Sequence, residues 1–261
     1  MDADMTLPID RDTAAPLVEP GPPLTPEERA RYARQLALPE IGEVGQRRLG
    51  AARVLVVGAG GLGSPVLTAL AGAGVGTIGI VDDDVVTVSN LHRQTIHAGS
   101  PEGSPKVESA ARALAALNPF VRVVPIAERI DLASAERLLA GWDVIVDGSD
   151  TFATQAIVAG AAAAHGIPLV WGSAIGLDGQ VGVFDRGGVG FDDLYPVLPV
   201  DDPGGTCRVA GVLGPVCGAV GSVMAMETIK LIVGAGRPLR GRILVLDALD
   251  QTWREVAIRR G

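Results

Sequence analysis

The chain has 261 residues, which is enough for one large α/β domain with a well-buried core. Its 22 Lys and Arg against 30 Asp and Glu give a net charge of −8, and this acidic balance argues against a nucleic-acid-binding face, which usually carries a basic excess. Two cysteines are too few for a disulfide framework or a four-cysteine zinc site, and they indicate a reducing, cytoplasmic compartment.

The first elements are a tail and a helix. Residues 1–24 contain five prolines and mixed charge without apolar periodicity, which predicts a flexible N-terminal tail in front of a single domain over residues 25–261. Thr25-Pro26-Glu27-Glu28 is typical of a helix start, because Thr25 can cap, Pro26 fits the first helical position and Glu28 can complete a capping box. This helix is expected to end near Leu38.

A nucleotide-binding unit follows. Arg53 to Val57 predicts a strand, and a glycine turn with Gly58, Gly60, Gly61 and Gly63 comes directly after it. Such glycines let backbone N–H groups approach a phosphate and let the next helix pack close to the sheet. That helix is expected over Gly61 to Gly74, and the strand Thr77 to Val81 ends at Asp82, whose carboxylate can accept from ribose hydroxyls. This part alone leaves NAD, FAD and other nucleotides open.

The remaining elements alternate before the pattern changes. Helices are expected at 106–117, 134–140 and 151–165, strands at 121–126, 143–147 and 168–172, and then strands at 180–184, 242–246 and 253–259 around a long apolar helix at 215–233. The alternation predicts a Rossmann-like, doubly wound, mostly parallel sheet with right-handed crossovers, and the last strands predict an antiparallel C-terminal extension. Asp185 to Leu213 is a long Gly- and Pro-rich loop, which is usually functional in a compact domain.

No targeting or membrane segment is expected. The N-terminus has no basic region followed by an apolar core, so a signal peptide is not predicted. Gly61 to Ile80 and Val209 to Met226 are long apolar stretches, but their glycines, prolines and change of period favour helix-turn-strand over a bilayer span.

The segment after Asp82 carries a family resemblance. Its phrase DDDVVTVSNLHRQ is accompanied by RYARQ at 31–35, PKVESA, DGSDTF at 147–152, TC-x-x-AGVLGP at 206–215 and MAMETIK at 224–230. Over about residues 29–260 the chain resembles the E1-like adenylyltransferases of the MoeB and ThiF group. The resemblance implies an enzyme that uses ATP to adenylate the C-terminal glycine of a small ubiquitin-like sulfur carrier protein ending in Gly-Gly, with release of pyrophosphate.

The resemblance also assigns residues. Arg93 and Lys106 match the cations that stabilise charge on the phosphoryl oxygens, and Asp150 matches the carboxylate that holds Mg²⁺, a hard cation suited to carboxylates and phosphates. Asp82 keeps the ribose role. Further nucleotide contacts are implied at Gly61, Ser89 and Asn90.

The resemblance implies roles for two more residues that are not nucleotide contacts within the same chain. Arg34 in RYARQ matches an arginine that reaches the triphosphate of the neighbouring subunit, which implies a homodimer. Cys207 matches the loop cysteine that in some relatives forms a covalent bond with the carrier or its sulfur, whereas other relatives adenylate without it, and the neighbouring Arg208 favours a thiolate. Cys217 is expected to be a small buried apolar residue.

The chain also departs from the family pattern. Many relatives hold a structural zinc with two C-x-x-C pairs, but the first region here reads Gly190 to Pro196 without cysteine, so no zinc bound by cysteines is expected. The DLYP phrase is similar to the zinc-free, MoeZ-like branch. No rhodanese domain is found in this chain, so a separate sulfur donor is implied if a thiocarboxylate is made, and Thr151 replaces the common Asn after the metal-binding Asp, which leaves its nucleotide contact open.

Two other functions remain alternatives. An NAD-dependent oxidoreductase is favoured only by the glycine turn, and it leaves the cations after Asp82 unexplained. A non-catalytic module that binds the carrier would keep the fold, but it would not need the residues assigned to the phosphates, such as Arg93 and Lys106. The sequence does not say which carrier or pathway is served, molybdopterin, thiamin or another sulfur transfer.

Overall fold

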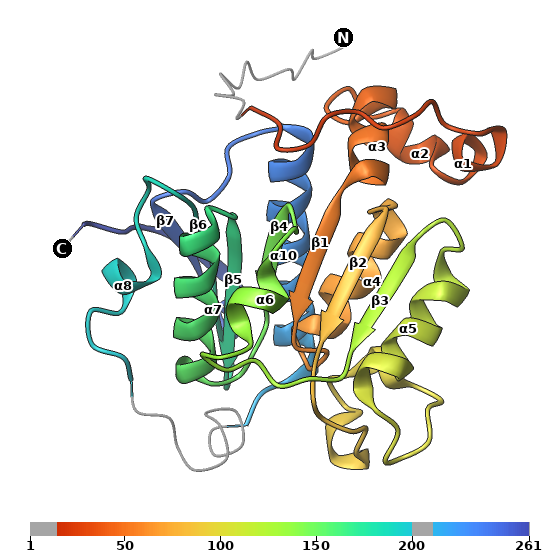
Figure 1. The fold of residues 1–261 in the computed structure, drawn as a ribbon. Helices are drawn as coiled ribbons and strands as arrows, with labels where there is room; N and C mark the ends of the chain where they lie inside the picture. Colours follow the sequence, from red (N-terminus) through yellow and green to blue (C-terminus); the bar gives the residue numbers. More distant parts are fainter. Residues whose placement is uncertain (1–14, 200–210, 261) are drawn as a thin grey trace, which may run out of the picture.

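The computed structural model describes residues 15–199 and 211–260, and they are built on one eight-stranded sheet (Figure 1). The strand order is β3-β2-β1-β4-β5-β6-β7-β8. The strands are β1 (Arg53–Val57), β2 (Thr77–Val81), β3 (Arg122–Ile126), β4 (Val144–Asp147), β5 (Leu169–Ile175), β6 (Asp178–Phe184), β7 (Arg242–Asp247) and β8 (Thr252–Ala257).

The sheet confirms the predicted fold class. β3, β2, β1, β4 and β5 pair in parallel, whereas β5 to β8 pair antiparallel. The chain moves outward from β1 to β3 and then returns to place β4 on the other side of β1. This reversal between β1 and β4 is the topological switch point, where α/β sheets of this type bind ligands at the carboxyl ends of the strands.

Helices cover both faces of the sheet (Figure 1). Strand side chains alternate between two hydrophobic clusters: Val54 and Val56 face one, and Leu55 and Val57 face the other, as the period of two requires. The first cluster is completed by α3 (Gly42–Ala51), α4 (Gly63–Ala73), α5 (Lys106–Leu117) and α10 (Gly214–Val233), and the second by α6 (Ala135–Leu139), α7 (Phe152–His165) and α8 (Phe191–Leu194).

The turn from β1 into α4 brings two backbone segments into very close contact. Gly58 has a φ of +87°, a conformation that residues with a Cβ rarely adopt. A Cβ on Gly63 would lie 2.0 Å from the carbonyl oxygen of Gly58. The predicted glycine turn is therefore required by geometry at these two positions.

The N-terminal helix begins as predicted and then breaks early. The capping box is present, with the Thr25 hydroxyl accepting from Glu28 N at 3.2 Å and the Glu28 carboxylate accepting from Thr25 N at 2.8 Å. The expected single helix is instead α1 (Pro26–Arg31) and α2 (Ala33–Leu36). Tyr32 separates them because it leaves helical geometry, with a ψ of 12°, while its ring is buried and its hydroxyl accepts from Asn118.

Three further differences concern segments with weak sequence signals. The helix α3 was not predicted; three of its ten residues are glycine and three are charged, which interrupts the apolar pattern, and its buried side includes Gly45 and Gln46. The strand β8 was expected to alternate, but all six of its residues are exposed, because it lies at the sheet edge without a covering helix. The expected loop after residue 185 contains the short helix α8.

Part of the predicted tail is tied to the domain. The N–H of Leu17 donates to the Leu231 carbonyl and that of Gly21 to the Arg47 carbonyl, both at 3.1 Å, and Arg47 Nε donates back to the Gly21 carbonyl at 2.8 Å. These contacts attach residues 15–24 to α10 and α3. A domain boundary at residue 24 stays a prediction.

One helix of the described part, α10, is long and apolar enough to cross a membrane. However, 61% of its apolar window is buried inside the structure. It packs against α4, α3, β5 and β6, so in this fold it is the central helix of the domain core.

One carboxyl group is also fully buried in the core. Asp147 ends β4 with no exposed surface; its Oδ1 accepts from Ser149 N at 2.9 Å, whereas its Oδ2 has no hydrogen-bond partner in the described part. Burial is the main reason why the pKa of Asp147 rises to about 6. Because an uncompensated buried carboxylate is costly, this residue opposes folding whenever it is ionised.

The close approach at Gly63 predicts a large difference between two glycines of one helix. We expect Gly63→Ala to destabilise the protein by about 3 kcal/mol or more, because the backbone has to move away from the new Cβ. Gly72→Ala, on the same helix with open space around it, is the control and should stabilise by about 0.5 to 1 kcal/mol. Urea unfolding measures both, and equal stability of the two variants would contradict the packing described.

The buried Asp147 predicts a pH-dependent stability. Its pKa is higher in the folded than in the unfolded chain, so the contribution of this group to stability is largest in acid and is lost as the pH rises through about 6. The free energy of unfolding of Asp147→Asn relative to wild type should therefore increase by about 3 kcal/mol between about pH 4 and pH 8. Asp143→Asn, which removes an exposed carboxylate that also accepts a backbone N–H, should show no such trend; an identical trend would refute the assignment.

Candidate functional site

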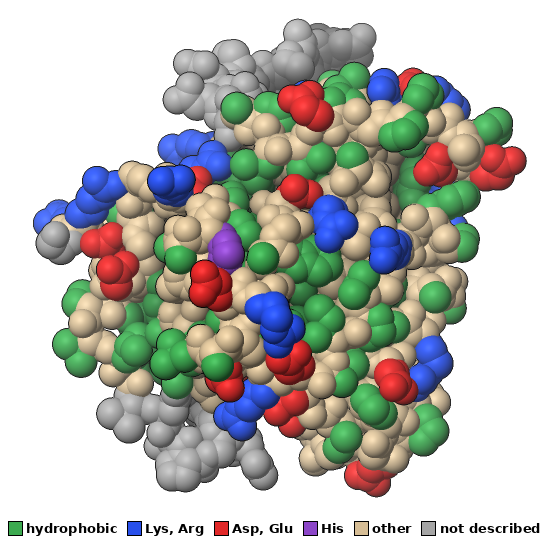
Figure 2. All heavy atoms as spheres, viewed as in Figure 1, with side chains coloured by type: hydrophobic (Ala, Val, Ile, Leu, Met, Phe, Trp, Pro, Cys, Tyr) green, Lys and Arg blue, Asp and Glu red, His purple; other side chains and the backbone are tan. Residues whose placement is uncertain are grey.

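The candidate site is a pocket of about 280 Å³ at the topological switch point. Its walls come from segments that follow β1, β2, β3 and β4, and from the end of β5. These strand ends lie together at the lower edge in Figure 1, and Figure 2 shows acidic and basic side chains side by side there. The pocket therefore lies where the sheet topology places ligands in this class of fold.

Most of the residues singled out from the sequence meet in this pocket. Eight of them line it, namely Gly58, Gly60, Gly61, Asp82, Arg93, Lys106, Asp150 and Thr151. Gly63 lies beneath the turn, and Ser89 and Asn90 lie in the short helix η1 (Val88–Asn90) away from the pocket lining. Cys207 falls outside the described residues, so its covalent role stays a prediction.

Asp82 braces the glycine turn from the end of β2. Its Oδ2 accepts from Ala59 N at 2.7 Å and its Oδ1 accepts from Asp84 N at 2.8 Å. Burial raises the pKa of this carboxyl, while the Lys106 ammonium acts in the opposite direction. The remaining lone pairs face the pocket, where hydroxyl donors of a ribose would satisfy them.

Lys106 is held by an acidic neighbour. Its Nζ lies 2.8 Å from Asp84 Oδ2, and its side chain is only 4% exposed against 70% for Asp84. Lys106 N also donates to the Asp84 carbonyl at 3.0 Å. No sequence pattern pairs Asp84 with another residue. In the structure, the Asp84 carboxylate holds the Lys106 ammonium in the pocket lining, where an anionic ligand can also contact the ammonium.

Arg93 and Cys217 close the pocket around Gly61. A Cβ on Gly61 would lie 2.9 Å from Cys217 Sγ and 3.4 Å from Arg93 Cδ, so the glycine leaves room for both side chains. The Arg93 Nη1 lies 3.0 Å from His92 Nε2. Cys217 is buried, as predicted, and it also forms part of the pocket lining.

Another wall of the pocket is formed by the amino end of α7. Thr151 caps this helix, because its hydroxyl accepts from Thr154 N at 3.2 Å and donates to Thr154 Oγ1 at 2.8 Å. The expected contact between Thr151 and a nucleotide would compete with this cap. Asp150 precedes it at an exposed position of the pocket lining, where its carboxylate is accessible to a cation.

Three pocket residues were given no role from the sequence. Gln94 and Gln155 are buried, and the side-chain oxygens of Gln94, Ser149 and Gln155 have no hydrogen-bond partner within the described residues. Gln155 Nε2 donates to the Ser149 carbonyl at 2.9 Å, which leaves its Oε1 as the free acceptor. Gln94 and Ser149 lie inside recognised phrases, but no spacing signal marks Gln155.

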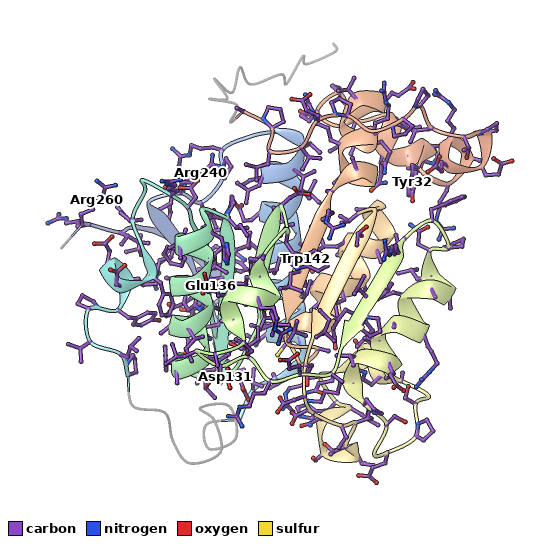
Figure 3. All side chains as sticks on the ribbon, viewed as in Figure 1. Tyr32, Asp131, Glu136, Trp142, Arg240 and Arg260 are labelled. Carbon is purple, nitrogen blue, oxygen red and sulfur yellow. The ribbon has the colours of Figure 1, made fainter. Side chains whose placement is uncertain are left out.

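Arg34 is the predicted site residue that the fold keeps away. It lies exposed on α2, two residues after Tyr32. Figure 3 labels Tyr32 near the amino ends of the parallel strands and Asp131, next to the pocket-lining residues 128–130, near their carboxyl ends. Within one chain, Arg34 and the pocket therefore lie at opposite ends of the sheet.

Comparisons with known proteins agree with this architecture. The ThiF family profile matches residues 32–261. The chain is 49% identical over 250 residues to the probable adenylyltransferase/sulfurtransferase MoeZ of Mycobacterium tuberculosis, a match that covers 94% of this chain but only 64% of that relative. It is 45% identical over 242 residues to the sulfur carrier protein adenylyltransferase of Thermus thermophilus, covering 90% of this chain and 89% of the relative.

The fold has solved counterparts as well. The crystal structure of PaaA superposes with a TM-score of 0.76 at 26% identity, over 90% of this chain and 75% of that one. The region that the ThiF family profile matches, residues 32–261, contains every strand of the sheet and all segments that line the pocket. The chain belongs to the ThiF family.

Proposed function

We propose that the protein adenylates the C-terminal glycine of a small ubiquitin-like sulfur carrier protein with ATP. The observation that carries this proposal is the meeting of the glycine turn, Arg93, Lys106 and Asp150 in one pocket at the switch point. A dinucleotide site needs the turn and Asp82, but it gives no reason for two cations and a second acid around the same space. Relatives named as adenylyltransferases support the same reaction.

The reaction needs charge stabilisation more than covalent chemistry. The carrier carboxylate attacks the α-phosphorus of ATP, a new acyl–phosphate bond forms, and the bond to the pyrophosphate breaks, leaving an acyl-adenylate and pyrophosphate. Negative charge grows on the phosphoryl oxygens and on the leaving group. Arg93 and Lys106 are cations held in place beforehand, so they stabilise this state at little reorganisation cost.

The acidic side of the pocket suits a magnesium ion. Asp150 is an exposed carboxylate in the same pocket lining as the cations, and Mg²⁺ is bound in such sites through one or two carboxylates, water and substrate phosphates. When bound, the ion would neutralise phosphate charge. Asp150 would hold it, while Asp84 would keep Lys106 on the opposite wall.

The carrier tail is proposed to enter from the β5 side. Ser173, Ala174, Ile175 and Val212 line this part of the pocket. Gly176 N donates to the Gly211 carbonyl at 2.8 Å, which fixes the end of the long loop beside β5. A Gly-Gly tail has no side chains beyond Cα hydrogens, so it would lie against this wall and reach the turn at Gly61.

The assembly around the reaction is part of the proposal. Because Arg34 lies at the far end of its own sheet, it can serve only the pocket of a neighbouring chain, which favours a homodimer with shared sites. Sulfur would come from a separate donor protein in the cytoplasm. The genomic neighbour that encodes a short protein ending in Gly-Gly would identify the carrier and its pathway.

The proposed roles predict a loss of activity in one variant and not in its control. We expect Arg93→Ala to reduce carrier-dependent exchange of pyrophosphate into ATP by about 100-fold, because it removes a preplaced donor to the growing charge. Arg112→Ala, which changes an exposed arginine on α5 that pairs with Glu108 and is not in the pocket lining, should keep full exchange. Full exchange in Arg93→Ala would show that Arg93 has no role in the reaction. A rise in melting temperature with NAD, and none with Mg-ATP, would reject the ATP site itself.

The shared site predicts complementation between two inactive subunits. Arg34→Ala and Lys106→Ala proteins should each lose exchange activity as homodimers. When they are mixed and allowed to exchange subunits, one site of each heterodimer has an intact Lys106 and receives Arg34 from its partner. About a quarter of all sites should then regain activity, and no recovery in verified heterodimers would exclude a role of Arg34 across the interface.

A further inference from the structure

A buried histidine outside the pocket connects the glycine turn with the helix that carries Lys106. His97 ends the short helix η2 (Thr95–His97) and has no exposed surface. Its Nε2 lies 2.8 Å from the Ala59 carbonyl oxygen, and its Nδ1 lies 2.9 Å from Ser109 Oγ on α5. It does not belong to the pocket lining, so its influence on a ligand must act through the groups it holds.

The hydrogen-bond partners fix the tautomer of His97. A carbonyl oxygen can only accept, so Nε2 must carry the proton and donate to Ala59. Nδ1 is then the acceptor, and the Ser109 hydroxyl donates to it. The Ser100 hydroxyl lies 2.6 Å from Ser109 Oγ and can donate in turn, which gives a chain of donors that runs in one direction from Ser100 to the glycine turn.

The surroundings keep the ring neutral. Burial is the main cause that lowers the pKa of His97; the ammonium of Lys106 from α5 acts in the same direction, and the carboxylate of Asp82 from the end of β2 acts against it. A neutral ring is the state that the hydrogen bonds require. A protonated Nδ1 would lose the Ser109 hydroxyl as a donor.

Together with Asp82, His97 holds the two consecutive peptide units on either side of the Ala59 Cα in the turn. The Ala59 N–H donates to Asp82 and the Ala59 carbonyl accepts from His97. The neighbours Gly58 and Gly60 have no Cβ to restrict the backbone. The orientation of the N–H groups that follow Ala59 therefore depends on these two side chains.

We propose that His97 is a positioning residue for nucleotide binding, which sets the glycine turn at a fixed distance from Lys106 so that backbone N–H groups and ammonium meet the same triphosphate. The proposal rests on the proposed function only for the identity of the ligand as ATP. His97 and Ser109 form the connection, with Ala59 at one end and α5 at the other. Loss of the imidazole would leave Lys106 and Arg93 in the chain but misaligned with the turn.

The test compares substitutions that keep or remove single hydrogen bonds. His97→Leu removes both bonds at similar size, His97→Gln retains an N–H donor toward Ala59, and Ser109→Ala keeps the imidazole without its hydroxyl donor. His165→Leu is the matched control, because His165 Nε2 also contacts a backbone carbonyl, that of Glu136 at 2.9 Å, but on the outer side of α7. Binding of Mg-ATP is measured directly by calorimetry, without carrier.

We expect His97→Leu to weaken Mg-ATP binding about tenfold and Ser109→Ala about threefold, as the loss of a buried hydrogen bond does. His97→Gln should stay within about threefold of wild type, and His165→Leu should bind as wild type does. In pyrophosphate exchange, the KM for ATP should rise more than kcat falls. A folded His97→Leu protein with wild-type affinity would overturn the proposal.

A second readout does not depend on the stability of the leucine variant. The ¹⁵N resonances of the His97 ring should show a neutral Nε2–H tautomer in wild type. Ser109→Ala should keep this tautomer, because the Ala59 carbonyl still requires a donor, and should shift the Nδ1 resonance, because Nδ1 loses the hydroxyl that donates to it. An Nδ1–H tautomer or a charged ring in wild type at neutral pH would overturn the proposal even if His97→Leu does not fold. Mg-ATP binding without carrier-dependent exchange would instead refute the proposed function and leave the role of His97 standing.

Discussion

The contact between the end of β1 and the start of α4 is the constraint on which the rest of the structure depends. Gly63 lies so close to the Gly58 carbonyl that no side chain fits. This approach directs the amino end of α4 toward the space above β1, and the neighbouring β4 adds the turn at residues 148–151 on the other side. Asp82, Arg93 and Lys106 are then arranged around a backbone whose position is already fixed.

Much of this arrangement was predictable from the sequence. Strand, glycine turn, helix and strand follow one another in Arg53 to Asp82 with a clear change of period, and the parallel order of the sheet follows from the alternation of elements. Several lining segments, among them the glycine turn, Asp82 and residues 148–151, lie directly after strands, where a parallel sheet brings them together. Arg93, Lys106 and Asp150 could thus be placed near the turn from their positions in recognised phrases.

The remaining features depend on contacts between distant segments. The break at Tyr32 arises from a hydroxyl that meets Asn118, which no local pattern encodes. The pairing of Lys106 with Asp84 depends on the fold of residues 84–106, where Val85 bridges to Pro105. No local sequence pattern marks His97, because its two partners, Ala59 and Ser109, lie 38 residues before and 12 residues after it.

The helix α10 connects two distant parts of the domain. Its carboxyl end is attached to α3 by Arg48, which donates to the Val233 carbonyl at 3.1 Å, and to the N-terminal segment by Leu17. Its first turn carries Cys217 next to Gly61. A helix of this length is a rod of about 30 Å, so it links the end of the sheet near Arg34 with the end that holds the pocket. One helix therefore contributes Cys217 to the pocket lining at its first turn and makes the contacts to α3 and the N-terminal segment at its last turn.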